Sequence, residues 1–238
     1  MAKSVQPIGL PLVDGLAAHP PPTIEDYCQA AAEYIRQASV VGAAKSKAAQ
    51  IRLSNALANV TVADLDRQGL DLRLAFAGER EVGGGLRSVK ADVSEMSVTD
   101  GLRLAVEIKP VHLAVGRAIW NRFGDVRTFA VNIHLKFPFA VVGGILTLPT
   151  TERLRSGDDT EWQSTARLVS RAVGRFMRAG GRHTEGDAAH LLEGIAVVAF
   201  DRETGLVEPD LPPVGSGLRS EEFIATMADA YQSRFGDI

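Results

Sequence analysis

Two alternating runs on either side of an Asp-Gly pair constrain the fold of this chain more than any other feature. The runs are Lys90–Val98 and Leu102–Lys109, and Asp100-Gly101 stands between them. Both turn residues tolerate the positive φ of a tight turn, so the pattern predicts a β-hairpin. In the second strand one face is expected to carry Leu102, Leu104, Val106 and Ile108, and the other Arg103, Ala105, Glu107 and Lys109.

The register of this hairpin decides which side chains meet. A two-residue loop places Lys109 opposite Asp92, and a four-residue loop places Glu107 opposite Asp92. Either register gathers Asp92, Glu107 and Lys109 on one face. A three-residue loop would put Asp92 opposite Ile108, on the wrong face.

Two carboxylates and an amine in one place indicate a cation site. Like charges this close repel each other unless a cation neutralises them. Hard oxygen ligands suit Mg²⁺, which completes its shell with water and substrate phosphate. A lysine beside that ion can position or deprotonate the attacking water, or stabilise charge that develops on phosphorus. The cluster therefore suggests metal-assisted phosphodiester hydrolysis. The alternative is a solvent-facing hairpin in which Glu107 and Lys109 merely pair.

Asp92, followed by Glu107-Ile108-Lys109, resembles the PD-(D/E)xK nuclease motif, with the acid on one strand of a hairpin and ExK on the next. Ala91 stands where the motif's name has proline. A helix-like segment from Val111 and a very apolar strand at 139–148 follow, in the order that the family requires. The resemblance covers residues 86–148 by motif order.

The resemblance implies an α/β fold with a restriction-endonuclease-like core, in which helices flank a mixed central β-sheet. It implies an Mg²⁺-dependent endonuclease that hydrolyses DNA, with Asp92, Glu107 and Lys109 as catalytic residues. Asp92 and Glu107 would hold the metal, with the Ile108 carbonyl as an extra ligand. Some nucleases of this type have a third carboxylate, for which Glu25 or Glu33 could serve.

Within the family, a short stand-alone chain is most similar to a type II restriction endonuclease. Such enzymes typically act as homodimers on a palindromic site in double-stranded DNA. RecB-type exonucleases carry a glutamine on the helix after ExK, and here no glutamine occurs between Lys109 and Gln163. A repair or resolvase-type nuclease and a non-catalytic nucleic-acid-binding module on the same fold remain alternatives.

A helical pattern is expected over 161–178, with an apolar stripe of Trp162, Val169, Val173 and Phe176. Opposite the stripe, at spacings of four, four and three, lie Arg167, Arg171, Arg175 and Arg178. Because these cations repel one another, phosphate contacts would stabilise them, and we expect them to bind the DNA backbone without reading sequence. Further arginines flank the helix at 153, 155 and 182. The alternatives are a solvated face, or a structural protein in which this helix is buried or paired with acids. A second basic set, Arg117, Arg122 and Arg127, follows the ExK strand.

Composition narrows the remaining classes. The 238 residues predict a flexible, proline-rich arm at 1–22 and a single domain at 23–238. The net charge of −3 requires any DNA-binding charge to be concentrated on one face. Cys28 is the single cysteine, which excludes a disulfide framework, and the five histidines lack the paired spacing of a zinc site. No apolar run spans a membrane and no signal peptide is evident, so we expect a cytoplasmic protein without membrane contact.

The other expected elements are helices at 23–39, 45–59 and 220–233 and strands at 70–76 and 194–200. Thr23 and Ser220 are expected to cap the first and last of these helices. Gly83-Gly84-Gly85 is expected to form a flexible connector.

Overall fold

The computed structural model describes residues 22–37, 43–72, 74–156 and 159–236. Its centre is a five-stranded sheet in the order β1-β2-β3-β4-β7. The strands are β1 (Ala75–Gly83), β2 (Ser88–Ser97), β3 (Gly101–Pro110), β4 (Val141–Pro149) and β7 (Gly194–Phe200). The first three pair antiparallel and the last three pair parallel, so the sheet is mixed.

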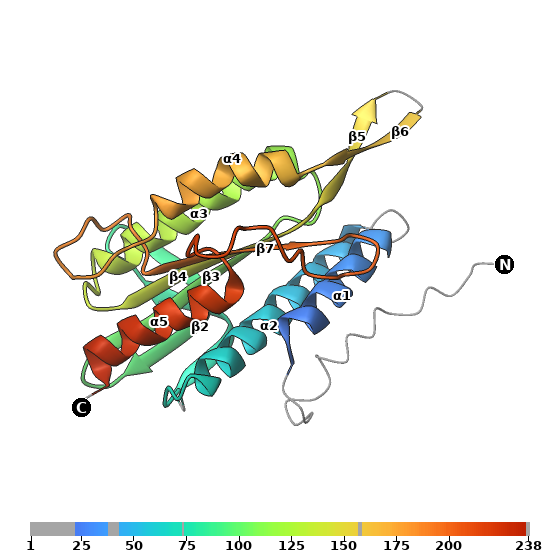
Figure 1. The fold of residues 1–238 in the computed structure, drawn as a ribbon. Coiled ribbons are helices and arrows are strands. Elements are labelled where there is room, and N and C mark those ends of the chain that lie inside the picture. The colour runs from blue at the N-terminus through green and yellow to red at the C-terminus, as the bar shows by residue number, and fades with distance from the viewer. Residues whose placement is uncertain (1–21, 38–42, 73, 157–158, 237–238) are drawn as a thin grey trace.

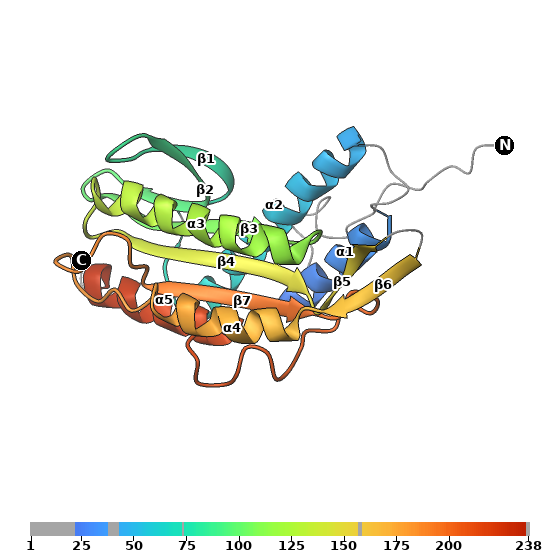
Figure 2. The same ribbon diagram turned by 90° about the horizontal axis from the view of Figure 1, so that it is seen from above.

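Helices cover both faces of this sheet (Figure 1). One face packs against α1 (Ile24–Gln37), α2 (Ala43–Arg67) and α5 (Ser220–Phe235). The other packs against α3 (Val115–His134) and α4 (Ala166–Met177), which lie side by side over it (Figure 2). The expected α/β fold with helices on both sides of a mixed sheet is confirmed.

The inner strand β4 divides two apolar cores. Every residue of β4 is buried, as expected for an inner strand. Val141 and Ile145 belong to the core under α1, α2 and α5, whereas Val142 and Leu146 belong to the core under α3 and α4. Gly144 allows α3 to approach closely, because a Cβ there would lie 2.3 Å from the Val126 Cγ1 atom.

The expected strand at 70–76 is wrong. The strand β1 begins at Ala75, and Leu70 and Leu72 precede it in irregular backbone, where both side chains enter the core beside α2. Their burial explains the apolar pattern without a strand.

Gly83-Gly84-Gly85 leads into the Asp92 strand as expected, but its backbone is hydrogen-bonded and closely packed rather than loose. Gly83 ends β1, and the Gly85 N–H donates to the Asn132 carbonyl at 2.7 Å. A Cβ on Gly85 would lie 2.4 Å from the Leu135 Cβ atom. These glycines allow the β1–β2 turn to pack tightly against the end of α3.

The helix expected over 161–178 begins later than the pattern indicated. Residues up to Ser164 form β6 (Asp159–Ser164), which pairs with β5 (Thr151–Ser156) in a ribbon that projects from the body of the molecule (Figure 1). Trp162 is therefore a strand residue and not part of the stripe. Val169 and Phe176 are buried under α4 as expected.

Helix ends agree in part with expectation. Thr23 caps α1, since its Oγ1 atom accepts the Asp26 N–H and the Asp26 carboxylate accepts the Thr23 N–H. The helix α2 continues to Arg67, past the expected end at 59. Ser220 does not cap α5; the N-cap is Arg219, whose backbone N–H donates to Glu222.

No helix in the described part of the chain is long and apolar enough to cross a membrane. The arm expected at 1–22 lies, except for its last residue, outside the described residues.

A buried ionic cluster ties the start of β7 to the ends of two helices. The Glu193 carboxylate accepts the Val142 N–H at 2.7 Å and lies 2.8 Å from the Arg234 guanidinium of α5 and 3.5 Å from that of Arg182. The His134 ring of α3 lies 3.4 Å from the same carboxylate. Glu193 is 2 % exposed, so its two cationic partners are needed to offset the loss of water.

We predict that Glu193→Ala lowers the free energy of unfolding by about 3 to 5 kcal/mol, because it leaves two arginines buried without their acid. Urea denaturation measures this, with Glu203→Ala as the control, since that carboxylate is exposed. A loss below about 1 kcal/mol would show that the cluster does not hold the two helices.

Candidate active site

The β2–β3 hairpin adopts one of the two registers that gather the three expected side chains. Val93 lies opposite Val106 and Ser94 opposite Ala105, so the next position along the ladder sets Asp92 across from Glu107. Ser97 pairs with Gly101 across a three-residue loop, and Gly101 has the expected positive φ of 74°. A bulge at Arg103 then shifts the register by one residue. The expectation that a loop of this length puts Asp92 on the wrong face is therefore wrong.

Because of the bulge, Leu102 does not share a face of β3 with the other three apolar residues, contrary to expectation. Leu104, Val106 and Ile108 share the core under α1, α2 and α5, but Leu102 lies in the opposite core with Ala105. Beyond the bulge the alternation holds, so Glu107 and Lys109 extend from β3 on the side of α3.

The two strands part beside Asp92. Their recorded pairs end at Val93 and Val106, although both strands continue. The Ile108 N–H, which faces β2, donates to the Asp92 Oδ2 atom at 2.7 Å instead of to a strand carbonyl. In an extended strand the N–H and C=O of one residue point the same way, so the Ile108 carbonyl also faces this gap.

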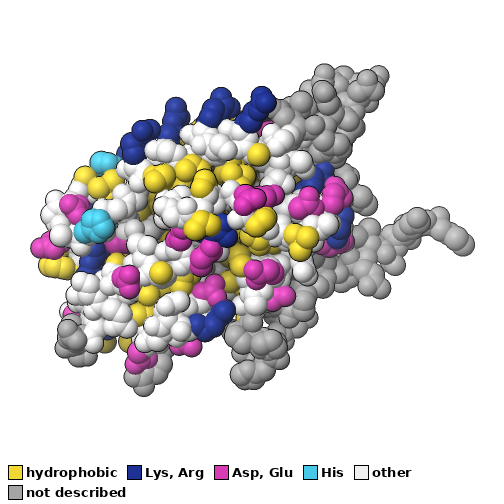
Figure 3. All heavy atoms as spheres, viewed as in Figure 1, with side chains coloured by type: hydrophobic (Ala, Val, Ile, Leu, Met, Phe, Trp, Pro, Cys, Tyr) yellow, Lys and Arg dark blue, Asp and Glu magenta, His cyan; other side chains and the backbone are white. Residues whose placement is uncertain are grey.

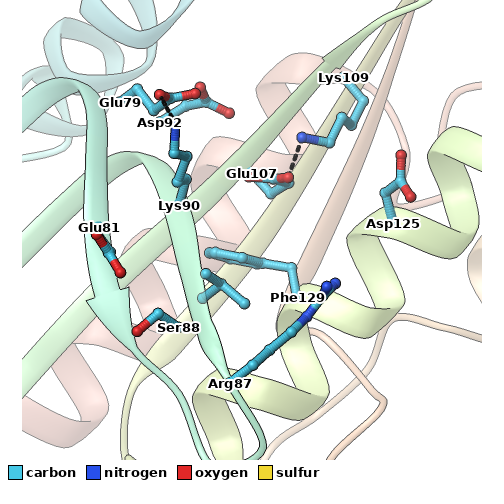
Figure 4. Close-up of a pocket in the computed structure, with 11 residues that line it drawn as sticks. Glu79, Glu81, Arg87, Ser88, Lys90, Asp92, Glu107, Lys109, Asp125 and Phe129 are labelled. Atoms are coloured by element: carbon cyan, nitrogen blue, oxygen red, sulfur yellow. Dashed lines mark hydrogen bonds and ion pairs between the residues drawn. The ribbon is translucent and has the colours of Figure 1, made fainter.

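Asp92, Glu107 and Lys109 line one open hollow of about 430 Å³ between β1, β2, β3 and α3 (Figure 4). Its floor includes Phe129 of α3. The lining carries five acidic and three basic side chains, which leave a net charge of −2: Glu79, Glu81, Asp92, Glu107 and Asp125, against Arg87, Lys90 and Lys109.

Burial raises the pKa of both central carboxyls. The pKa of Glu107 rises to about 7 because the side chain is desolvated; the nearby Lys109 ammonium lowers it, and the Asp92 charge raises it further. Desolvation also raises the pKa of Asp92, against the lowering effect of the Ile108 N–H and Lys109. Lys109 forms an ion pair with Glu107 and is thus one cation shared by two carboxylates.

The donor set suits a divalent cation that keeps part of its water shell. Two carboxylates and the Ile108 carbonyl converge on the gap, and Mg²⁺ commonly takes one or two protein carboxylates plus water and phosphate oxygens. Within the described residues, no group of three or more His, Cys, Asp or Glu side chains is arranged to hold a metal.

The acids considered for a third ligand do not reach this hollow. Glu25 and Glu33 lie on α1, which packs on the opposite face of the sheet, and Glu33 pairs with Arg36. The acids that do act on the central pair are Glu79 of β1, which raises the pKa of Asp92, and Asp125 of α3, which raises that of Glu107.

The sequence patterns did not identify Glu79 and Asp125 as site residues. Glu79 and Glu81 alternate within β1, but the apolar alternation at 70–76 predicts a strand that ends before them. Asp125 is reached only through the packing of α3, and no local pattern marks it.

The four arginines expected to contact DNA are all exposed, three on α4 and Arg178 at its C-cap. A row of basic side chains follows α4 along the upper edge of the molecule (Figure 3). The ion pairs recorded among the described residues include none of the four; Arg175 stacks on Trp120 of α3 at 4.6 Å from the ring centroid. We call Arg167, Arg171, Arg175 and Arg178 the α4 line. The helix α3 lies between α4 and the strands β1 and β2 that line the hollow (Figure 2).

Of the flanking arginines, Arg182 does not extend this line. Arg182 is 2 % exposed and pairs with Glu193, so it is a buried structural residue. The side chains of Arg153 and Arg155 lie outside the described part of the structure.

No protein-family model matches the chain, and no curated protein or solved structure matches it either. The candidate site therefore stands on its own geometry and chemistry.

The raised pKa of Glu107 makes a prediction about stability. Its value of about 7 in the folded state lies above the ordinary 4.5, so the folded state binds this proton more tightly than the unfolded state. The contribution of Glu107 to the free energy of unfolding therefore falls as pH rises from about 4.5 to about 7.

Glu107→Gln removes this dependence, and we predict that without metal the variant is more stable than wild type at pH 8, with a gap that narrows toward pH 5. Urea denaturation in a chelator at several pH values measures it, with Glu203→Gln as the exposed control. Parallel pH profiles for wild type and Glu107→Gln would contradict the prediction.

Proposed function

We propose that this protein is a divalent-metal-dependent deoxyribonuclease that hydrolyses phosphodiester bonds of duplex DNA. The observation that carries the proposal is the convergence of Asp92, Glu107 and Lys109 in one hollow, at the point where β2 and β3 part.

The charge of the hollow supports a role for a cation. Its lining carries a net charge of −2, and a phosphodiester adds a further negative charge. Phosphate can therefore approach only if a cation is bound or the acids are protonated. Asp92, Glu107 and the Ile108 carbonyl would hold Mg²⁺, which when bound supplies Lewis-acid polarisation of the phosphate and lowers the pKa of water.

Each side chain has a distinct task in this proposal. Asp92 is fixed by the Ile108 N–H and also forms a side-chain hydrogen bond with Glu107, so the two carboxyls are held next to each other. Lys109, released from Glu107 when that carboxylate takes a metal, would orient the attacking water and stabilise charge on the phosphate oxygens. Phe129 gives the hollow an apolar floor that strengthens these interactions.

The α4 line supports nucleic acid as the substrate class. A structural role for this helix predicts buried or acid-paired arginines, whereas these four are exposed. Exposed, closely spaced guanidinium groups suit phosphate contacts that do not read sequence.

Cleavage at a specific palindromic site by a homodimer, as in type II restriction endonucleases, is the finer form of the proposal. It rests on the resemblance of the motif alone. A repair or resolvase-type nuclease would use the same three residues.

We predict that Lys109→Ala lowers the rate of plasmid cleavage in Mg²⁺ by at least about 100-fold, because it removes the cation nearest the attacking water. Gel electrophoresis of supercoiled plasmid measures this, and discrete fragments would indicate a specific site. Lys47→Ala is the matched control, since this exposed lysine lies on α2, over the other face of the sheet. An inert wild-type protein, or equal cleavage by Lys109→Ala, would contradict the proposal.

A second prediction needs no activity. Saturating Mg²⁺ should stabilise the wild-type protein by about 1.4 kcal/mol when its concentration is ten times Kd. Glu107→Gln should lose this gain, because a neutral amide is a weaker ligand, whereas Glu203→Gln should keep it. Thermal or urea unfolding with and without Mg²⁺ measures the difference. Equal gains for wild type and Glu107→Gln would place the metal elsewhere.

A further inference from the structure

A second hollow of about 660 Å³ lies on the outward surface of α3. Its lining runs along the helix and includes Arg117, Trp120, Asn121, Arg122 and Asp125. Asp125 also lines the first hollow, so the two depressions adjoin at this residue. We call the second depression the α3 groove.

The α3 groove offers cationic and amide donors at its surface. Arg117, Asn121 and Arg122 are all exposed. The single acid in the lining, Asp125, lies 3.1 Å from the Arg122 guanidinium and is neutralised by it. Gly124 lies between them on the helix, and a Cβ there would meet no atom within 4 Å, so the groove has open space above its backbone.

The far side of the groove reaches the α4 line. Trp120 lines the groove, and the Arg175 guanidinium stacks over its ring at 4.6 Å. The same indole packs near Phe176, which anchors α4 in the core. A continuous surface therefore leads from the acidic hollow, past Asp125, across α3 and on to the arginines of α4.

We propose that the α3 groove binds the sugar-phosphate backbone of duplex DNA that flanks the phosphate held in the acidic hollow, with Arg117 as its principal phosphate contact. This assignment deepens the proposed function and rests on it. Charge complementarity favours a polyanion as the ligand, because the groove carries two arginines against one acid and lies next to the exposed arginines of the α4 line.

The test is the salt dependence of binding, measured without metal so that cleavage plays no part. A fluorescein-labelled DNA duplex is titrated with protein in EDTA between 50 and 200 mM salt, and anisotropy gives Kd. Each phosphate contact contributes about 0.9 to the slope of log K against log salt. Arg117→Ala is expected to lower that slope by about 1 and to weaken binding roughly 8-fold at 0.1 M salt.

Two variants control for charge and folding. Arg67→Ala removes an exposed arginine from α2, on the other face of the sheet, and should leave slope and Kd unchanged. Asp125→Asn frees Arg122 from its acid, so this variant should bind more tightly and with a steeper slope. Damage to the fold would not tighten binding, so this opposite sign separates a contact from misfolding.

Equal slopes for Arg117→Ala and Arg67→Ala would overturn the inference, as would wild-type protein that binds no duplex in EDTA. Plasmid cleavage in Mg²⁺ is scored separately. If the wild-type protein cleaves plasmid but Arg117→Ala does not change DNA binding, the groove assignment is wrong and the nuclease proposal stands. If the protein does not cleave plasmid but Arg117→Ala changes the slope as predicted, the groove is a DNA-binding surface and the nuclease proposal is wrong.

Discussion

The hydrogen bond from the Ile108 N–H to the Asp92 carboxylate is the constraint on which the candidate site depends. A backbone donor that loses its partner in a parting sheet must find another acceptor, because an unpaired buried N–H is costly. Asp92 supplies that acceptor at 2.7 Å. The same side chain thereby joins the two strands and is fixed across from Glu107. The position of the Asp92 carboxylate is thus set by a backbone N–H that requires an acceptor. The alternation of β3 places Lys109 on the same face as Glu107.

The Glu193 cluster and the pair of Asp92 and Glu107 differ in how far positive charge neutralises them. Glu193 has two arginines, a histidine and a backbone N–H around it, and it is enclosed. Asp92 and Glu107 share the single ammonium of Lys109, beside a hollow that is open to solvent. A carboxylate surrounded by two arginines is typical of a structural role, whereas a deficit of positive charge in an accessible depression is typical of a functional site. This contrast separates the candidate site from ordinary ion pairing in the same chain.

The hairpin and its three side chains could be predicted because an Asp-Gly turn and strict alternation act over short distances. The choice between registers could not, since it depends on the bulge at Arg103. Leu102 is apolar and finds a core on either face, because helices cover both sides of the sheet. The start of β1 could not be predicted for a similar reason. Leu70 and Leu72 alternate and are buried, but they do not form a strand. Trp162 fits a helical stripe by spacing, yet it pairs across a ribbon, which a local pattern does not distinguish. Asp125 joins the site only through the tertiary packing of α3.

The helix α3 divides the charges of this surface. On one flank lies a hollow with a net charge of −2, and on the other lie the arginines of α4, in a chain whose overall charge is only −3. In the proposed reaction these two regions have complementary tasks. The arginines attract a polyanion over a longer range but do not select one phosphate, while the hollow repels a phosphate until a cation neutralises its acids. DNA held by the arginines of α4 would raise the local concentration of phosphate at the acidic hollow. A cation bound in the hollow would remove the repulsion between its acids and that phosphate. In the proposed function, separation of the two charges by one helix would therefore allow the same fold to hold DNA and to admit a phosphate to the acids once a cation is bound.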